Sequence, residues 1–192
     1  MSVGYWETLA TQTNDGPTLT AGTRASCIDQ RARYTLAANR LRVGDILRVR
    51  AFGRISSAVT TPGNSSWDLA AGVLGAIKIF DTLPLLGNIV VQTNVPWWLE
   101  FETTVRTTGS GTSATCFGGG LIASTAFLNV QAPATGPYAG VVPVPFNTAP
   151  VVGSGWDSTL ATILDLCFTQ TTGTFSQVTH NYTLSLMTSS GF

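Results

Sequence analysis

Apolar and polar side chains alternate with a period of two along several stretches of this chain, and this pattern constrains the fold most. Within residues 46–54, Leu47, Val49 and Ala51 fall on one side, and the arginines between them fall on the other. The same alternation recurs in three further stretches, residues 97–106, 160–169 and 182–187. Because successive side chains of a β-strand project to opposite faces, each stretch predicts a half-buried strand with one face on a core.

Turn-forming residues separate these stretches. Gly44-Asp45 precedes the first strand, residues 61–64 (TPGN) follow it, and residues 108–111 (TGSG) lie between two later strands. No segment shows a helical period, and a chain of 192 residues that is 44% hydrophobic can bury one sizeable core. The sequence therefore predicts an all-β fold, a jelly-roll β-sandwich formed by a single domain.

Three segments depart from the regular alternation. Residues 8–23 are polar and rich in threonine, so we expect residues 1–25 to form an extended N-terminal arm or an edge strand, and residues 26–192 to form the sandwich. Residues 116–124 (CFGGGLIAS) predict a strand whose glycines admit a neighbour or a bulge. Residues 131–150 contain five prolines and predict a long surface loop or an irregular crossing strand, because proline donates no backbone hydrogen bond.

The charge content excludes several classes of protein. Only 10% of the residues are charged, against about 25% in an ordinary domain, and ten basic side chains balance ten acidic ones. This balance argues against an electrostatic nucleic-acid binder and against a polybasic membrane-surface protein. No apolar run approaches the ~18 residues of a spanning helix, and residues 1–10 lack the features of a secretory signal. We expect neither a nucleic-acid nor a membrane partner.

Catalysis needs convergent titratable side chains, and the sequence offers few of them. The single histidine, His180, opens the last predicted strand, and no G-x-S-x-G motif supports a nucleophile for it. Glu100 and Glu102 share one strand face roughly 7 Å apart, a spacing compatible with a glycosidase pair, but a solvated strand face is the better interpretation. We expect no enzyme.

The cysteines give no sign of a metal site or of a disulfide framework. Cys27, Cys116 and Cys167 are odd in number and form no C-x-x-C pair. With a single histidine in the chain, they have no metal-ligand spacing. We therefore expect free thiols, buried or half-buried, and neither a metal nor a cofactor.

Arginines cluster in one part of the chain. Eight of the ten basic residues fall between Arg24 and Arg54, and all eight are arginines. The planar guanidinium suits a protein interface, but ion pairing within the domain or a solvated face remains open, and nucleic acid is disfavoured because only Phe52 interleaves the cluster. Two aromatic residues near the N-terminus are candidates for anchoring on a neighbour, although burial in their own subunit remains open. The candidate interface residues are Tyr5, Trp6, Arg48, Arg50 and Arg54.

Several segments together resemble, in order and spacing, a recurring type of tailed-bacteriophage structural protein. They are residues 16–23 (GPTLTAGT), 34–39 (YTLAAN) running into 41–49 (LRVGDILRV), 92–100 (QTNVPWWLE), 107–112 (TTGSGT), 147–150 (NTAP) and 155–159 (GWDST). The resemblance covers about residues 16 to 186, and none of its motifs is catalytic. It implies a small jelly-roll protein that decorates phage heads, also called a cement protein.

The resemblance also implies partners and a location. Such proteins are non-enzymatic, commonly trimeric and bound to the outer surface of the capsid, so the expected partners are further copies of the chain and the major capsid protein. The expected location is the virion, after synthesis in the host cytoplasm. The proline-rich residues 131–150 depart from the family pattern.

The same resemblance leaves an alternative open, because some relatives serve as head fibres or as receptor-binding tips. The alternative function is a receptor- or carbohydrate-binding domain of a phage fibre or tail tip. Exposed tryptophans in an open groove would favour it. The alternation places Trp97 on the apolar face, so Trp98 and Trp156 are the side chains to inspect.

Overall fold

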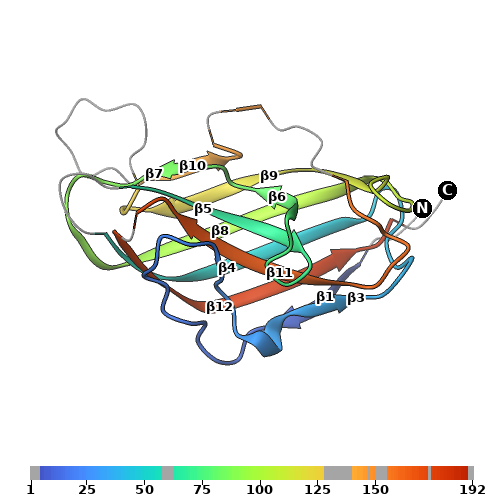
Figure 1. Cartoon of the computed structure of the whole chain (residues 1–192), viewed down its shortest axis with the longest axis horizontal. Coiled ribbons are helices and arrows are strands. Elements are labelled where there is room, and N and C mark those ends of the chain that lie inside the picture. The colour runs from blue at the N-terminus through green and yellow to red at the C-terminus, as the bar shows by residue number, and fades with distance from the viewer. Residues whose placement is uncertain are drawn as a thin grey trace.

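Two antiparallel β-sheets pack face to face in the protein (Figure 1). The computed structural model describes residues 5–57, 63–127, 140–146, 148–149, 155–172 and 174–189. The predicted all-β sandwich is therefore confirmed, whereas the narrower jelly-roll topology stays a prediction.

The larger layer, called sheet A here, has the strand order β1-β12-β4-β8-β9-β10. Its strands are β1 (Trp6–Thr11), β12 (Phe175–Met187), β4 (Ile46–Ser57), β8 (Gln92–Thr107), β9 (Thr115–Ser124) and β10 (Val141–Val144). Strands β8, β9 and β10 follow one another as a meander, and β4 lies between β12 and β8. The two central strands of sheet A are therefore β4 and β8.

The opposite layer, called sheet B, has the order β2-β11-β5-β6, with β3 pairing to β11 and β7 pairing to β5. Its strands are β2 (Ala25–Ser26), β11 (Thr162–Gln170), β5 (Asn64–Ala71), β6 (Ile77–Asp81), β3 (Tyr34–Leu36) and β7 (Leu85–Leu86). One 3₁₀ turn, η1 (Gln30–Ala32), precedes β3. In the described part of the chain, no helix has the length and apolar character needed to span a membrane.

The core fills the space between the sheets. It contains Trp97, Phe101 and Phe168, which the period-two pattern assigns to it, and also Trp67 and Phe80 from strands β5 and β6, for which no alternation was predicted. Trp67 of β5 packs against Trp97 of β8, with ring centroids 5.0 Å apart, and against Phe168 of β11 at 4.8 Å. Phe80 of β6 stacks on Phe101 of β8 at 4.2 Å. Large aromatic rings from both layers thus meet in one core, which is how a sandwich buries its two apolar faces.

The glycines of β9 make this close packing possible. A Cβ atom at Gly118 would lie 2.9 Å from Cδ2 of Phe80, and one at Gly120 would lie 2.5 Å from Cα of Phe101. The prediction that glycines in residues 116–124 admit a neighbour is confirmed, because the missing side chains leave room for the stacked phenylalanines.

The N-terminal segment packs against the sandwich of the same chain. Trp6–Thr11 form β1, which pairs with β12 as the edge of sheet A, and Leu19 then bridges Gln177. The chain reaches sheet B at β2, whose residues pair with β11. Residues Trp6–Thr11 thus form an edge strand of sheet A, and the division of the chain at residue 25 stays a prediction.

Sheet B differs from the prediction in one respect. Residues 160–169 were expected to form a strand with one exposed face, but β11 begins at Thr162, and Asp165 on the outer face is fully buried. The outer face is covered because Arg33 reaches over it, with Nε donating to Asp165 Oδ1 at 3.3 Å. A local pattern does not reveal such coverage, since Arg33 is far away in sequence.

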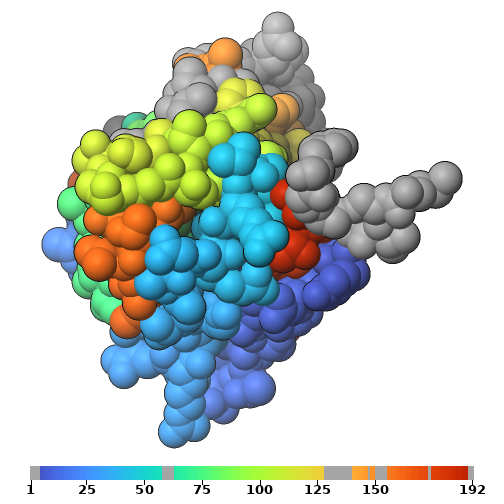
Figure 2. Space-filling model, turned by 90° about the vertical axis from the view of Figure 1, so that its right-hand side faces the viewer, coloured from blue at the N-terminus to red at the C-terminus, as the bar shows by residue number. Residues whose placement is uncertain are grey.

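At one end of the sandwich, three segments lie side by side (Figure 2). They contain Asn39, the β8–β9 turn at Gly109, and Ser158. Ser158 donates its backbone N–H to the carbonyl of Gly109 in the β8–β9 turn, at 3.0 Å, and accepts from the backbone N–H of Asn39 at 2.8 Å. Asp157 Oδ2 also accepts from the backbone N–H of Gly111 at 2.9 Å. These bonds fix the end of the long hairpin β8–β9.

The proline-rich residues 131–150 are described only at 140–146 and 148–149. Their one regular element is β10, an edge strand that contains Pro143 and pairs with β9. Proline is tolerated at an edge because its missing N–H can face solvent. The rest of this predicted loop lies outside the described residues.

Candidate functional site

The outer face of sheet A carries an exposed pair of aromatic side chains. Phe52 of β4 lies opposite Trp98 of β8 in the strand register. Their rings are stacked, with centroids 5.3 Å apart and an interplanar angle of 4°. Phe52 is 39% exposed and Trp98 is 45% exposed. Two large rings held parallel at the centre of a sheet face form a ready platform for a ligand.

Strand alternation places Trp98 outward by burying its neighbour. Trp97 is fully buried and donates Nε1–H to the carbonyl of Val178 at 3.3 Å. The buried Trp97 side chain fixes the orientation of β8. Because successive side chains of a strand alternate, Trp98 must face outward. The expectation that Trp97 lies in the core is confirmed, and of the two tryptophans to inspect, Trp98 is exposed whereas Trp156 is buried.

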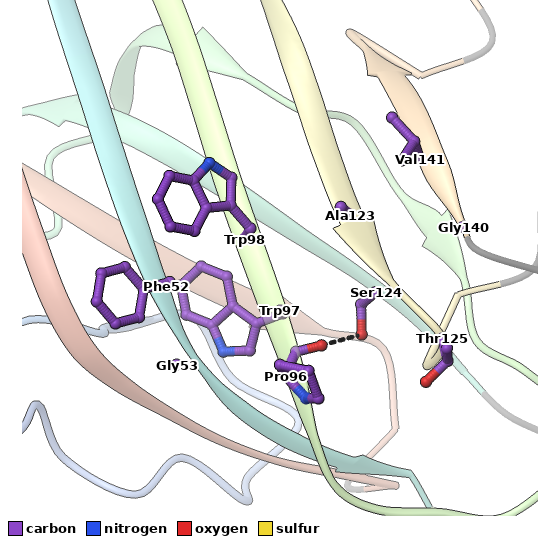
Figure 3. Close-up of a pocket in the computed structure, with 10 residues that line it drawn as sticks. All are labelled: Phe52, Gly53, Pro96, Trp97, Trp98, Ala123, Ser124, Thr125, Gly140 and Val141. Atoms are coloured by element: carbon purple, nitrogen blue, oxygen red, sulfur yellow. Dashed lines mark hydrogen bonds between the residues drawn. The ribbon is translucent and has the colours of Figure 1, made fainter.

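Two open depressions flank the Trp98 indole. The first has a volume of about 340 Å³ and is lined by Phe52, Pro96, Trp98, Ala123 and Val141, among others (Figure 3). The second has a volume of about 470 Å³ and continues from Trp98 along β8 and β9. Because both share Trp98, Ala123 and Val141, we treat them as one feature and call it the aromatic groove.

Small residues give the aromatic groove its depth. Ala123 lies opposite Trp98 on β9, and Gly119 lies opposite Glu102. Side chains this small leave the indole standing above the neighbouring strand. The far rim is apolar and exposed, and it is formed by Leu121 and Val141.

Ion pairs form the polar side of the aromatic groove. Arg50 Nη2 lies 2.8 Å from Glu100 Oε1, and Arg48 Nε donates to Glu102 Oε1 at 2.7 Å. These pairs join directly opposite residues of β4 and β8, the geometry in which cross-strand charges attract. Glu100 and Glu102 lie on the outer strand face, as predicted, and the arginines of β4 neutralise them there.

The structure brings four of the five candidate interface residues onto this face. Arg48, Arg50 and Arg54 alternate with inward side chains along β4, so they share the outer face with Phe52. Trp6 of β1 reaches the same face, where the Arg48 guanidinium lies 3.9 Å from the centroid of its ring. The fifth candidate, Tyr5, is exposed just before β1.

Most arginines of the cluster are paired within the domain. Arg24 binds the buried Asp68 through Nε at 2.9 Å, and Arg40 Nη2 lies 2.7 Å from Glu7 Oε2. Arg33, Arg48 and Arg50 also have carboxylate partners. Arg54 is exposed, and no carboxylate of the described residues lies within 4.0 Å of it. Intradomain pairing thus accounts for much of the arginine cluster.

The titratable groups do not converge on a reactive centre in the described part of the chain. His180 Nδ1 lies 2.8 Å from Asp15 Oδ1, at a bulge between Thr179 and Asn181. This position is inside β12, so the expectation that His180 opens a strand is wrong. The start of β12 was missed because inward polar residues, Gln177 and Thr179, interrupt the apolar pattern. No group of three metal-ligating side chains occurs among the described residues.

The three cysteines are free and buried, as predicted. Burial raises the pKa of the Cys116 thiol and of the Cys167 thiol to about 12. The same desolvation raises the pKa of Cys27 well above its ordinary value. Since the reactive form of a cysteine is the thiolate, these residues are chemically inert in the fold.

No protein-family model and no curated protein sequence matches the chain. Among solved structures, the chain is similar to the CBM2 module of the evolved Dit of Lactobacillus casei BL23 phage J-1. The identity is 7% and the TM-score is 0.36, over 98% of this chain and 99% of that chain. A similarity this low gives no information on a ligand. The candidate site is therefore described by the geometry of sheet A alone.

Proposed function

We propose that the chain is a non-enzymatic, carbohydrate-binding β-sandwich of a bacteriophage virion, and that the outer face of sheet A holds a polysaccharide of the host-cell surface. The exposed, parallel Phe52–Trp98 pair in an open groove is the observation that carries the proposal. A sugar ring has an apolar face of C–H groups, which packs on an aromatic ring, and an edge of hydroxyl groups, which need hydrogen-bonding partners. The aromatic groove offers both kinds of contact.

The polar neighbours of the platform fit the hydroxyl groups of a sugar. Arg50 and Glu100 lie beside the aromatic pair, and Asn181 lies opposite Phe52 on β12. Guanidinium, carboxylate and amide groups together provide donors and acceptors. The charges of Arg48 and Arg50 are balanced by Glu102 and Glu100, so these two arginines give little attraction to the phosphates of a nucleic acid. Arg54 is the neighbouring arginine of β4 that has no carboxylate partner among the described residues.

The groups that could perform hydrolysis are held in other contacts. Glu100 and Glu102 are bound by arginines on the same face, and His180 pairs with Asp15 at the β12 bulge. A glycosidase needs one carboxyl group free to donate a proton and a second one across a cleft. These contacts support a binding role without catalysis.

Decoration of a phage capsid is the second candidate function, and a separate surface patch favours it. Leu86, Ile89, Val90 and Val91 are exposed around the start of β8. Several exposed apolar side chains within six residues of sequence suit a protein partner, here another copy of the chain or the major capsid protein. The phage assignment in both candidates rests on the segment resemblance within residues 16–186, which implies a location on the virion after synthesis in the host cytoplasm.

Replacing Trp98 by alanine tests the carbohydrate proposal. The wild-type protein and the Trp98→Ala variant are applied to an array of bacterial surface polysaccharides, and the affinity for the best-binding one is then measured by calorimetry. We expect at least a tenfold loss, because a central aromatic contact contributes more than about 1.4 kcal/mol. Leu160→Ala is the matched control, since Leu160 is exposed but precedes β11 of sheet B.

Two results would count against the carbohydrate proposal. The first is equal binding by the wild type and by Trp98→Ala. The second is a wild-type protein that binds no polysaccharide but co-sediments with undecorated phage heads, and this result would establish the capsid candidate instead.

A further inference from the structure

We propose that Trp6 forms a second sugar-binding subsite on the outer face of sheet A, so that the protein binds an extended internal stretch of an uncharged polysaccharide and not only its end. This inference rests on the proposed carbohydrate function and deepens it. The edge strand β1 then contributes directly to the binding surface.

Trp6 is held in place by its neighbours on the face. It is the first residue of β1 and pairs with Met187 of β12. Its ring lies against the guanidinium of Arg48, 3.9 Å from the centroid, and Arg48 is itself fixed by Glu102. A cation held on a ring face at this distance orients the indole. Trp6 nevertheless remains 38% exposed, so part of its surface is available to a ligand.

A continuous row of side chains connects Trp6 with the Phe52–Trp98 platform. Arg48, Arg50 and Phe52 project from the outer face of β4 at every second residue. The distance from Arg48 to Phe52 along the strand is roughly 14 Å. A single sugar ring cannot contact both aromatic sites at that separation, whereas an oligosaccharide can.

The residues between the two aromatic sites indicate which ligand charge the face favours. The charges of Arg48 and Arg50 are compensated by Glu102 and Glu100. The second depression of the aromatic groove lies beside these residues, where Glu100 and Glu102 of β8 and Gly119 of β9 line it. Neutralised ion pairs can exchange hydrogen bonds with sugar hydroxyls but give no net attraction to an anionic polymer, and therefore an uncharged sugar chain fits best.

Two subsites on one face predict an affinity that depends on ligand length. A fragment of one repeat unit occupies the Trp98 platform alone. A long fragment contacts both sites, and its second contact is intramolecular and costs little additional entropy. Loss of Trp6 should therefore weaken the binding of long fragments only.

The test measures affinity as a function of fragment length. The probes are the best-binding polysaccharide of the array and its acid-hydrolysis fragments, from a single repeat unit upward, and the measurement is calorimetric titration. We expect Trp6→Ala to lower the affinity for long fragments roughly three- to tenfold, the contribution of one aromatic contact, and to leave the affinity for the single repeat unit unchanged. Thr11→Ala, an exposed position on the same strand, is the matched control.

A second variant guards against a folding defect in β1. Arg48→Gln removes the cation from the Trp6 ring and leaves β1 intact, so it should reproduce the length-dependent loss in weaker form. An unchanged affinity of Trp6→Ala for long fragments overturns the inference, and so does an equal loss at both lengths. Failure of the carbohydrate function is distinguishable, because the wild type would then bind no fragment of any length.

Discussion

Two adjacent tryptophans have opposite environments on β8, and the outward one forms the exposed aromatic platform with Phe52. Trp97 is fixed in the core against Trp67 and the Val178 carbonyl, whereas Trp98 stacks on Phe52 at the surface. The buried ring stabilises the strand, and the exposed ring adds little to the core. A substitution at Trp98 should therefore change binding more than stability, which makes the Trp98→Ala experiment interpretable.

The burial of the three cysteines predicts that they react slowly in the native protein. Cys27, Cys116 and Cys167 should react with Ellman's reagent far more slowly in the native protein than after unfolding in guanidinium chloride. Burial both blocks access and keeps the thiols protonated, with the pKa of Cys116 and of Cys167 raised to about 12. Unfolding should release all three thiols, and rapid labelling of any one of them in the native protein would contradict this assignment.

The strand β9 combines two functions through its glycines. Gly118 and Gly120 face the core and leave room for Phe80, Phe101 and the β8 backbone. Gly119 faces the other way, opposite Glu102, and contributes to the hollow of the aromatic groove. One run of three small residues thus permits close packing between the sheets and shapes the ligand surface.

Substitution of Gly120 by alanine tests the packing role of β9. Its Cβ atom would lie 2.2 Å from the carbonyl oxygen of Glu100, so β8 and β9 would have to separate. We expect a loss of roughly 1–3 kcal/mol in the free energy of unfolding, measured by urea denaturation. Gly119→Ala is the matched control on the outer face and should change stability by less than about 0.5 kcal/mol. Similar effects of the two substitutions would contradict the assigned directions.

At the scale of the whole molecule, the two exposed apolar features are formed by different residues. The aromatic groove runs along the outer faces of β4, β8 and β9, whereas the patch of Leu86, Ile89, Val90 and Val91 surrounds the start of β8. Copies of the chain associated through the patch would therefore retain their grooves. Several grooves on one particle would strengthen attachment to a repetitive polysaccharide.

The exposed apolar patch predicts self-association, and the resemblance within residues 16–186 implies that the oligomer is a trimer. Light scattering of the purified protein should give a trimer of roughly 60 kDa, from three chains of 20.2 kDa. Charged residues introduced into the apolar patch, as in the double variant Ile89→Asp, Val90→Asp, should shift the mass to that of one chain. The pair Val73→Asp, Leu74→Asp, exposed in the β5–β6 turn, is the control. A wild-type protein that is monomeric at high concentration would exclude the trimer.

Local sequence determined which side chains face the core and which face outward. Strand alternation is a property of consecutive residues, so it predicts the inward Leu47, Val49 and Trp97 and the outward Trp98 without knowledge of the partners of each strand. The alternation fails where polar side chains are buried. It missed the start of β12, because Gln177 and Thr179 point inward, and it missed the coverage of Asp165.

Only the tertiary structure decided which outward side chains meet. The groove requires Phe52 opposite Trp98, the neutral face requires Arg48 opposite Glu102, and the second subsite requires Trp6 beside Arg48. Each contact joins residues about 40 to 55 positions apart, and a shift of one residue in the pairing would send every side chain of a strand to the other face. Strand order and register follow from the packing of the whole sandwich, and therefore the outer face of sheet A is assembled only when both sheets have folded.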